Sequence, residues 1–180
     1  MKVISTSLQD CKIIKPKIFQ DERGFFLETF QEEKYSEIFG PNISFVQDNF
    51  SRSTMGSLRG LHFQNLKPQG KLVRVSRGSV FDVAVDLRIK SPTFGRWEGF
   101  DLNEENMNQL WIPPGFAHGF LATSEIVDFE YKCTDYYDPN DEGCIHWRDP
   151  DLNITWPLNI QYIVSKKDEN GSSFYSLFHQ

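Results

Sequence analysis

The sequence predicts a mainly β protein, built as an antiparallel sandwich or barrel. Aromatic side chains favour strands, and they make up 14% of the 180 residues, including 16 phenylalanines. Short apolar or alternating runs recur along the chain and are separated by turn residues. Only one segment has a convincing helical pattern. Several short strands at this spacing favour antiparallel sheets over a doubly wound α/β fold.

The predicted helix covers residues 31–40, with the sequence QEEKYSEIFG. Acidic residues occupy its first turn, where they interact favourably with the positive end of the helix dipole. Tyr35, Ile38 and Phe39 gather on one side of the helix, and Gly40 is a stop signal. A short helix with one apolar side is therefore expected here.

Strand-like runs fill the middle of the chain. The stretch KLVRVSRGSVFDVAVDL, residues 71–87, places Arg77-Gly78 between two such runs, which predicts a β-hairpin. Further runs follow at residues 94–102 (FGRWEGFDL), 108–123 (NQLWIPPGFAHGFLAT) and 125–134 (EIVDFEYKCT).

Two features interrupt this pattern of strands. Pro113-Pro114 cannot lie in a central strand, because proline has no N–H to donate, so the chain is expected to turn there. From Asp138 onward, turn residues mix with the segment IHWRDPDLNITWPL. This last part is expected to be irregular and to pack on its tryptophans.

Composition limits the class of protein. A length of 180 residues is enough for one well-buried core and predicts one domain. The net charge of -6 argues against a nucleic-acid partner, which normally requires a basic face. Three cysteines without CxxC spacing suit reduced thiols, and no run approaches membrane-spanning length. We therefore expect a soluble cytoplasmic protein that binds neither nucleic acid nor membranes.

Two histidines lie among apolar residues and glycines. His62 stands in GSLRGLHFQ, residues 56–64, and His118 stands in PPGFAHGF just after the predicted turn. A histidine in an apolar run is most often structural, held by hydrogen bonds of its ring. A metal site would also use histidine, but the HxH pair followed by a glutamate that marks metal-binding double-stranded barrels is absent. We expect no metal.

Three cations and a tyrosine suggest an anionic ligand. Arg59, Arg23 and Lys71 have the ordinary interpretation of surface residues whose stems pack on the sheet. Arg59, however, lies close to His62 on a strand that looks interior, and its planar fork suits phosphate or carboxylate. Tyr131 has the ordinary role of packing, but a phenol titrates near pH 10 and can donate a proton.

Several enzyme classes lack their usual motifs in this sequence. There is no GxSxG, no GxGxxG and no Walker loop, which are typical of acyl hydrolysis, dinucleotide redox chemistry and phosphoryl transfer. Spacing alone thus offers a base, a phenolic acid and anion-binding cations, but no activated nucleophile.

The chain resembles the dTDP-4-dehydrorhamnose 3,5-epimerase family, which are cofactor-independent sugar-nucleotide epimerases of L-rhamnose biosynthesis. The resemblance runs from about Asp21 to Asp168. It rests on DERGFFLETF, FVQDNFSRSTMGSLRGLHFQ, QGKLVRVSRGSVFDVAVDLR, SPTFGRW, QLWIPPGFAHGF and YKCTDYYDP, in the family's order. It implies a cupin-type antiparallel jelly-roll barrel with a few short helices, a homodimer and no cofactor.

The resemblance also assigns roles to residues. It implies that His62 is the general base, that Asp168 orients and polarises it, and that Tyr131 is the acid on the opposite face of the sugar. Lys71 matches the cation beside the C4 oxygen. The implied substrate-binding residues are Arg23, Phe26, Glu28, Gln47, Asp48, Asn49, Arg59, His118, Glu142 and Lys167.

The resemblance implies one epimerase domain over residues 1–180, with an N-terminal segment exchanged between subunits. Arg23 and Glu28 match the segment that reaches the partner's site in this family. Arg148 departs from the family pattern, which commonly has Asn there, but touches no catalytic position. The expected reaction is epimerisation at C3 and C5 of dTDP-4-dehydro-6-deoxy-D-glucose. The alternatives are a 3- or 5-mono-epimerase on a related sugar and a non-catalytic sugar-binding cupin.

Overall fold

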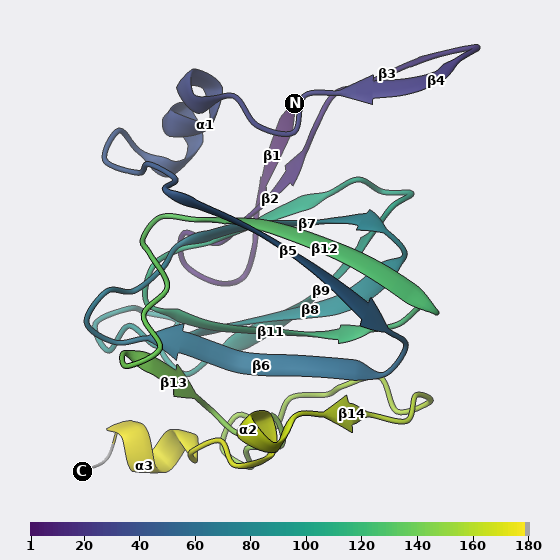
Figure 1. Ribbon diagram of the computed structural model, residues 1–180. Helices are drawn as coiled ribbons and strands as arrows, with labels where there is room; N and C mark the ends of the chain where they lie inside the picture. The colour runs from purple at the N-terminus through teal and green to yellow at the C-terminus, as the bar shows by residue number, and fades with distance from the viewer. Residues whose placement is uncertain (179–180) are drawn as a thin grey trace.

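The computed structural model describes residues 1–178 and consists mainly of two β-sheets packed face to face (Figure 1). The first sheet has the order β1 (Lys2–Ser5), β2 (Lys12–Lys15), β10 (Gln109–Ile112), β7 (Lys71–Arg77), β12 (Ile126–Cys133), β5 (Gln47–Thr54). The second has the order β13 (Glu142–Cys144), β6 (Ser57–Gln64), β11 (Phe116–Ala122), β8 (Ser79–Asp86), β9 (Trp97–Asn103), and β14 (Ile163–Val164) pairs with β6. All neighbours are antiparallel except β14 and β6, so the predicted antiparallel class is confirmed.

Strand alternation places the main core between the two sheets. Phe129 of β12 and Phe120 of β11 stack with ring centroids 4.3 Å apart, which joins the sheets across the core. Burial of each such side chain stabilises the fold by about 1.5–3 kcal/mol. Other inward residues are Val73, Val75, Val80, Ala84, Phe100, Leu102, Leu110, Ile112 and Val127.

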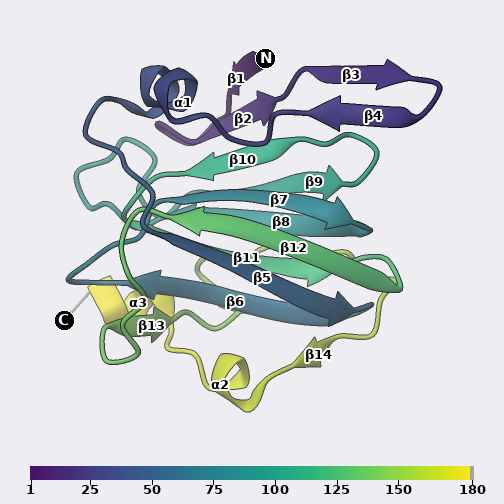
Figure 2. The same ribbon diagram turned by 45° about the horizontal axis from the view of Figure 1, so that its top comes forward.

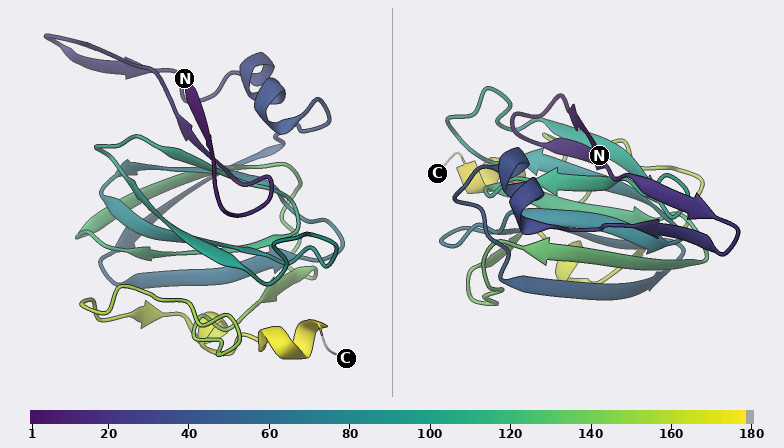
Figure 3. Two further views of the ribbon diagram at one scale, coloured as in Figure 1. Left: turned by 180° about the vertical axis from the view of Figure 1, so that it is seen from behind. Right: turned by 90° about the horizontal axis from the view of Figure 1, so that it is seen from above.

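Each sheet is also covered on its outer face. The helix α1 (Glu32–Phe39) packs on the first sheet, where buried Tyr35 contacts Ile14, Leu72 and Trp111. The C-terminal segment, with α2 (Lys166–Glu169) and α3 (Phe174–Phe178), lies along the second sheet, as Figure 3 shows from behind. Its tryptophans are buried there, and the indole N–H of Trp156 donates to the carbonyl of Trp147 at 2.9 Å. The expected packing of the last part on its tryptophans is confirmed.

The predicted helix is confirmed at residues 32–39. The side chain of Gln31 accepts a hydrogen bond from the backbone N–H of Lys34, and Gly40 follows the last turn with φ 102°. The helices are short, and among residues 1–178 none is long and apolar enough to cross a membrane.

The predicted hairpin at Arg77-Gly78 is wrong. The two runs are strands, β7 and β8, but β7 pairs with β10 and β12 whereas β8 pairs with β11 and β9. The chain passes from one sheet to the other at Gly78. Both runs have the residue pattern of strands in either arrangement, so the sequence could not show whether they pair with each other. The expected turn at Pro113-Pro114 is confirmed between β10 and β11.

One irregularity in β6 determines which side chains face the core. His62 is opposite His118 and Arg59 is opposite Phe120, so three steps along β6 match two steps along β11. Such a bulge inserts one extra residue and breaks the alternation. Arg59 and His62 therefore share the inner face, although three-residue spacing in a regular strand would separate them.

Glycine makes this bulge possible. Gly60 has φ 127°, and a Cβ built there would lie 2.5 Å from the Cα of Gly119. A Cβ on Gly119 would lie 2.7 Å from the carbonyl oxygen of Arg59. The two backbones meet more closely than side chains allow.

A separate hairpin projects away from the two sheets. Strands β3 (Ile18–Asp21) and β4 (Gly24–Leu27) pair only with each other, and Figures 1 and 2 show them extending beyond the body. Phe19, Phe25 and Phe26 on this hairpin are 50%, 56% and 69% exposed. An apolar surface of this kind is typical of a contact site for another molecule.

Substitution of Gly60 tests the bulge. We expect Gly60→Ala to lower the free energy of unfolding by about 3 kcal/mol or more, because both the left-handed backbone and the contact with Gly119 oppose a Cβ. Gly40→Ala is the matched control, since its φ is 102° but nothing lies within 4 Å of its Cβ position. It should cost only about 1–2 kcal/mol. Equal losses in urea denaturation would contradict the steric account.

Candidate active site

A cavity of about 240 Å³ opens between the two sheets at one end. Residues from both sheets line it, together with loop residues at its mouth. They are Gln47, Asn49, His62, Phe63, Gln64, Gln69, Lys71, Tyr131, Tyr137 and Glu142. Six of these were predicted site residues: Gln47, Asn49, His62, Lys71, Tyr131 and Glu142.

The first sheet supplies two rows of polar side chains to this cavity. Tyr131 of β12 is opposite Asn49 of β5, and the next inward position, Cys133, is opposite both Gln47 and Lys71. Residues opposite one another across a ladder face the same side of the sheet. Along β12 the inward positions are Val127 and Phe129 in the apolar core, followed by Tyr131 and Cys133 at the cavity.

The second sheet supplies His62, which is paired with a carboxylate. Its Nε2 lies 2.6 Å from Oδ1 of Asp168, and Asp168 is only 3% exposed. The backbone N–H of Asp168 donates to the Ser165 hydroxyl, the cap of α2, at 3.1 Å. Burial pushes the pKa of Asp168 up, but the bond from His62 and the Ser165 and Gly60 contacts outweigh it and hold the pKa below its usual value.

An ionised Asp168 determines the tautomer of His62. A carboxylate is acceptor-only, so Nε2 carries the proton and donates it to Asp168. The lone pair of Nδ1 is then free to accept a proton from a ligand in the cavity. This arrangement is that of an oriented general base.

Tyr131 stands on the opposite sheet and keeps its proton. Burial raises the pKa of its phenol, the electrostatic interaction with Cys133 adds to this, and Arg59 opposes it. The phenol is thus protonated at neutral pH. Base and acid belong to different sheets and line one cavity, which is what proton removal on one face and return on the other require.

Lys71 is the cation of the cavity. Burial lowers the pKa of its ammonium, and electrostatic interactions with Cys133, Asp82 and Glu142 oppose that shift. Its side chain points between the sheets, because Lys71 is two residues before Val73 on β7 and alternate residues of a strand face the same side. A positive charge in a dry cavity stabilises a developing anion more than it would in water.

His118 lies behind His62 rather than in the cavity lining. It is 7% exposed, it is opposite His62 in the ladder, and its Nε2 lies 2.9 Å from Oδ2 of Asp82. Burial lowers the pKa of His118 while the charge of Asp82 opposes this. The sequence reasoning missed Asp82, which is fully buried. An acid at the inward position of the apolar strand VFDVAVD was the signal that could have revealed it.

Residues at the mouth connect β13 to α2. The carboxylate of Glu142 accepts from the ammonium of Lys167 and from the Tyr137 hydroxyl, the latter at 2.8 Å. Burial pushes the pKa of Glu142 up, but these two bonds outweigh it and hold the pKa below its usual value. Tyr137 and Gln64 are cavity residues that the sequence reasoning did not single out.

Several other predicted residues do not line this cavity from their own chain. Arg23, Phe26 and Glu28 belong to or follow the projecting hairpin, where Arg23 pairs with Asp21 and Glu28 with Lys34. Asp48 faces outward from β5 and pairs with Lys132 at 2.8 Å. Arg59 is inward but largely exposed, and its Nε donates to Ser53 at 3.1 Å.

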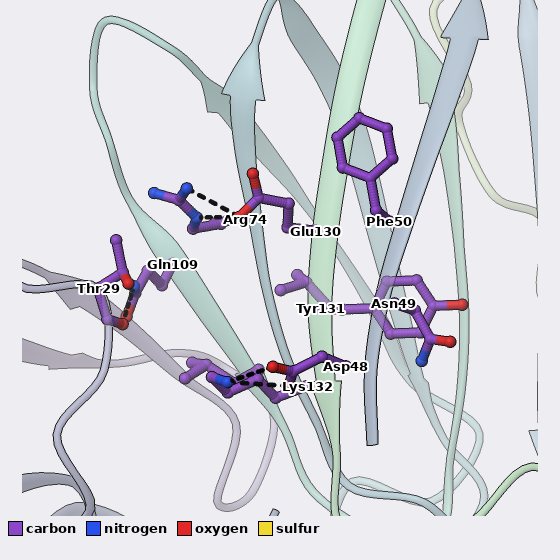
Figure 4. A pocket seen from close by; sticks show the side chains of 11 residues that line it. Thr29, Asp48, Asn49, Phe50, Arg74, Gln109, Glu130, Tyr131 and Lys132 are labelled. Carbon is purple, nitrogen blue, oxygen red and sulfur yellow. Dashed lines mark hydrogen bonds and ion pairs between the residues drawn. The ribbon is translucent and has the colours of Figure 1, made fainter.

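Asp48 belongs instead to a second pocket, of about 380 Å³, on the outer side of the first sheet (Figure 4). Its charged side chains are joined in the ion pairs Asp48–Lys132 and Arg74–Glu130. Phe50 at its edge is 61% exposed. Exposed aromatic rings such as Phe50 are enriched at protein contact surfaces.

Comparison with known proteins agrees with this site. The family model described as dTDP-4-dehydrorhamnose 3,5-epimerase matches residues 5–176. The curated enzymes of that name from Pseudomonas aeruginosa and Salmonella typhimurium are 51% and 52% identical to the chain over 174 and 169 residues. The matches cover 97% and 93% of this chain and 96% and 92% of those proteins.

Solved structures show the same relationship. The 3,5-epimerase of Legionella pneumophila in complex with dTDP-4-keto-L-rhamnose has a TM-score of 0.93 at 56% identity, covering 96% of this chain and 92% of that one. The similarity confirms the predicted cupin-type jelly roll. A 3-epimerase from Streptomyces niveus is 38% identical over 158 residues, covering 87% of this chain and 76% of that protein. The chain belongs to the dTDP-4-dehydrorhamnose 3,5-epimerase family.

Proposed function

We propose that the protein epimerises C3 and C5 of dTDP-4-dehydro-6-deoxy-D-glucose to give dTDP-4-dehydro-L-rhamnose. The observation that carries the proposal is the placement of His62 and Tyr131 on opposite sheets around one cavity. Family membership supports it, and the substrate class follows the product bound to the Legionella pneumophila relative. The reaction is an isomerisation within dTDP-L-rhamnose biosynthesis.

The chemistry begins with removal of a proton beside the ketone. C3 and C5 both flank the C4 carbonyl, so loss of either proton gives an enolate whose charge rests on the C4 oxygen. Nδ1 of His62 takes the proton, and the carboxylate of Asp168 stabilises the resulting imidazolium through Nε2. Lys71 stabilises the enolate oxygen with its ammonium.

Inversion follows from proton return on the other face. The phenol of Tyr131 donates its proton to the carbon from the side of the first sheet, which yields the epimer. His118 and Asp82 support the wall behind His62. Arg59 binds the diphosphate, while Gln47, Asn49, Glu142 and Lys167 contact the sugar and nucleotide.

The substrate site includes a partner subunit in this proposal. The chain acts as one epimerase domain in a homodimer, and Arg23, Phe26 and Glu28 enter the partner's cavity on the projecting hairpin. Exposed phenylalanines on that hairpin, together with the outward pocket around Phe50, support a subunit contact. Phe26 would stack on the thymine. The net charge of -6 and three free cysteines suit a cytoplasmic enzyme without nucleic-acid or membrane partners.

The principal alternative is a mono-epimerase acting at C3 or C5. Such an enzyme would keep both His62 and Tyr131, so the catalytic pair does not separate the two. The 44–53% identity to curated relatives named 3,5-epimerases, against 38% to the Streptomyces niveus 3-epimerase, favours reaction at both carbons.

Turnover in deuterated water tests the reaction. We expect deuterium at both C3 and C5 of the product, because each proton is removed to the solvent-exchanging base and replaced by the acid. Mass spectrometry and NMR of the sugar measure the label. Label at one carbon would reassign the protein as a mono-epimerase, and no label with intact binding would leave a sugar-binding cupin.

Substitutions of the base and the acid should fail differently. We expect His62→Ala to lower turnover by about 10²–10⁴-fold with nucleotide binding retained, because no group then removes the proton. Tyr131→Phe should still exchange substrate protons with deuterated solvent but lose the epimerised product. A Tyr131→Phe protein with wild-type product formation would show that another group supplies the proton.

Mixing of inactive variants tests the exchanged hairpin. Arg23→Glu and His62→Ala are each expected to be inactive as homodimers. After unfolding and refolding together, half of the dimers are mixed, and each has one site with both residues intact. Activity should return to about a quarter of the wild-type value. A mixture that stays inactive would show that Arg23 serves its own subunit or that no dimer forms.

A further inference from the structure

Three potential metal ligands meet beside the cavity. A ring nitrogen of His62, Sγ of Cys144 and a carboxylate oxygen of Asp168 all lie within 4.8 Å of one another. Among residues 1–178 no other group of three His, Cys, Asp or Glu side chains has this arrangement. The proposed epimerisation uses His62 and Asp168 but gives Cys144 no task.

The fold places Cys144 there by register. It is opposite His62 in the ladder of β13 and β6, so the two side chains share the inner face of the second sheet. Figure 1 shows α2, which carries Asp168, beside the end of β13. The Cys144 thiol lies 3.8 Å from Oδ1 of Asp168.

These spacings are close to those of a zinc site. Zinc bound at about 2.3 Å to sulfur and about 2.0–2.1 Å to nitrogen and oxygen separates its tetrahedral ligands by roughly 3.3–3.6 Å. The S–O separation is 3.8 Å and the N–O separation is 2.6 Å. The N–S separation is within 4.8 Å, so adjustments of at most roughly 1.3 Å reach the required geometry, and the cavity beside His62 leaves the fourth position to water.

We propose that His62, Cys144 and Asp168 form an inhibitory binding site for a thiophilic divalent cation of the Zn²⁺ class. Thiolate and imidazole together select Zn²⁺ over hard cations such as Mg²⁺. On binding, Cys144 releases its thiol proton to solvent, and the Nε2 proton of His62 is replaced by one taken up at Nδ1, so the imidazole stays neutral. The metal takes the place of the His62–Asp168 hydrogen bond. The base is then misdirected, and activity stops.

Two measurements test this site, and only the first depends on the proposed function. Zn²⁺ added to the purified protein should inhibit epimerisation, and EDTA should restore it while leaving metal-free enzyme unaffected. Co²⁺ titrated into the protein should give a thiolate-to-cobalt charge-transfer band in the near ultraviolet, whether or not the protein is an epimerase. Absence of that band in the wild-type protein would overturn the site.

Cys144→Ala is the decisive variant. Its basal activity should match the wild type, because Cys144 contacts neither substrate nor a reacting atom in the proposed reaction. It should lose the cobalt band. The Zn²⁺ concentration for half inhibition should rise at least about 100-fold, because even loss of a residue that only supports a metal ligand lowers metal affinity by about 10–100-fold. Cys144→Ser provides the same test if the alanine variant folds poorly.

Cys11→Ala is the matched control. Cys11 is a buried thiol in the main core, where it packs with residues outside the metal cluster. This variant should keep both the cobalt band and the sensitivity to Zn²⁺. Inhibition of Cys144→Ala at wild-type Zn²⁺ concentrations, or loss of the band in Cys11→Ala, would place the metal elsewhere and refute the proposal.

Discussion

The close contact of Gly60 with Gly119 is the constraint on which the active site depends. It allows one extra residue in β6, and that residue returns Arg59 and His62 to the same side of the sheet. Without the bulge, one of the two would face the C-terminal segment and its tryptophans. The placement of Arg59 relative to His62 is therefore set by the backbone rather than by side-chain contacts. Catalytic geometry built on a strand in this way is more rigid than geometry built on loops.

Burial affects the groups of the cavity in opposite directions, and their partners decide the outcome. Tyr131 is desolvated without a cation in direct contact, so its pKa rises and it keeps its proton. Asp168 is more deeply buried, but the hydrogen bond from His62 keeps it charged. The cavity between the two sheets thus holds a protonated phenol, that of Tyr131, and an ionised carboxylate, that of Asp168, beside His62. Tyr131 and His62 belong to different sheets, which suits a reaction that removes a proton from one face of a carbon and returns it to the other.

Local sequence features were sufficient for the strands, for the short helix before Gly40 and for the turn at Pro113-Pro114, since each depends on neighbouring residues. Pairing was not, because the strand pattern of β7 and β8 is the same whether they form a hairpin or enter different sheets. The pair of His62 and Asp168 spans 106 positions, so no spacing could reveal it and only the family resemblance proposed it. Asp82 was overlooked although its inward position was visible in the sequence. Arg59 and His62 were placed together, but the bulge that makes this possible leaves no sign beyond two glycines.

The crossing of the chain at Gly78 also has a consequence for synthesis. Because β7 and β8 enter different sheets, β7 must wait for β10 and β12, and β12 ends at Cys133. A ribosome therefore releases about three quarters of the chain before the first sheet can close. Until then β5 lacks the strand it pairs with, and long-range pairing of this kind is slow. Nascent chains of this protein are thus candidates for chaperone binding during that interval, independently of how stable the finished sandwich becomes.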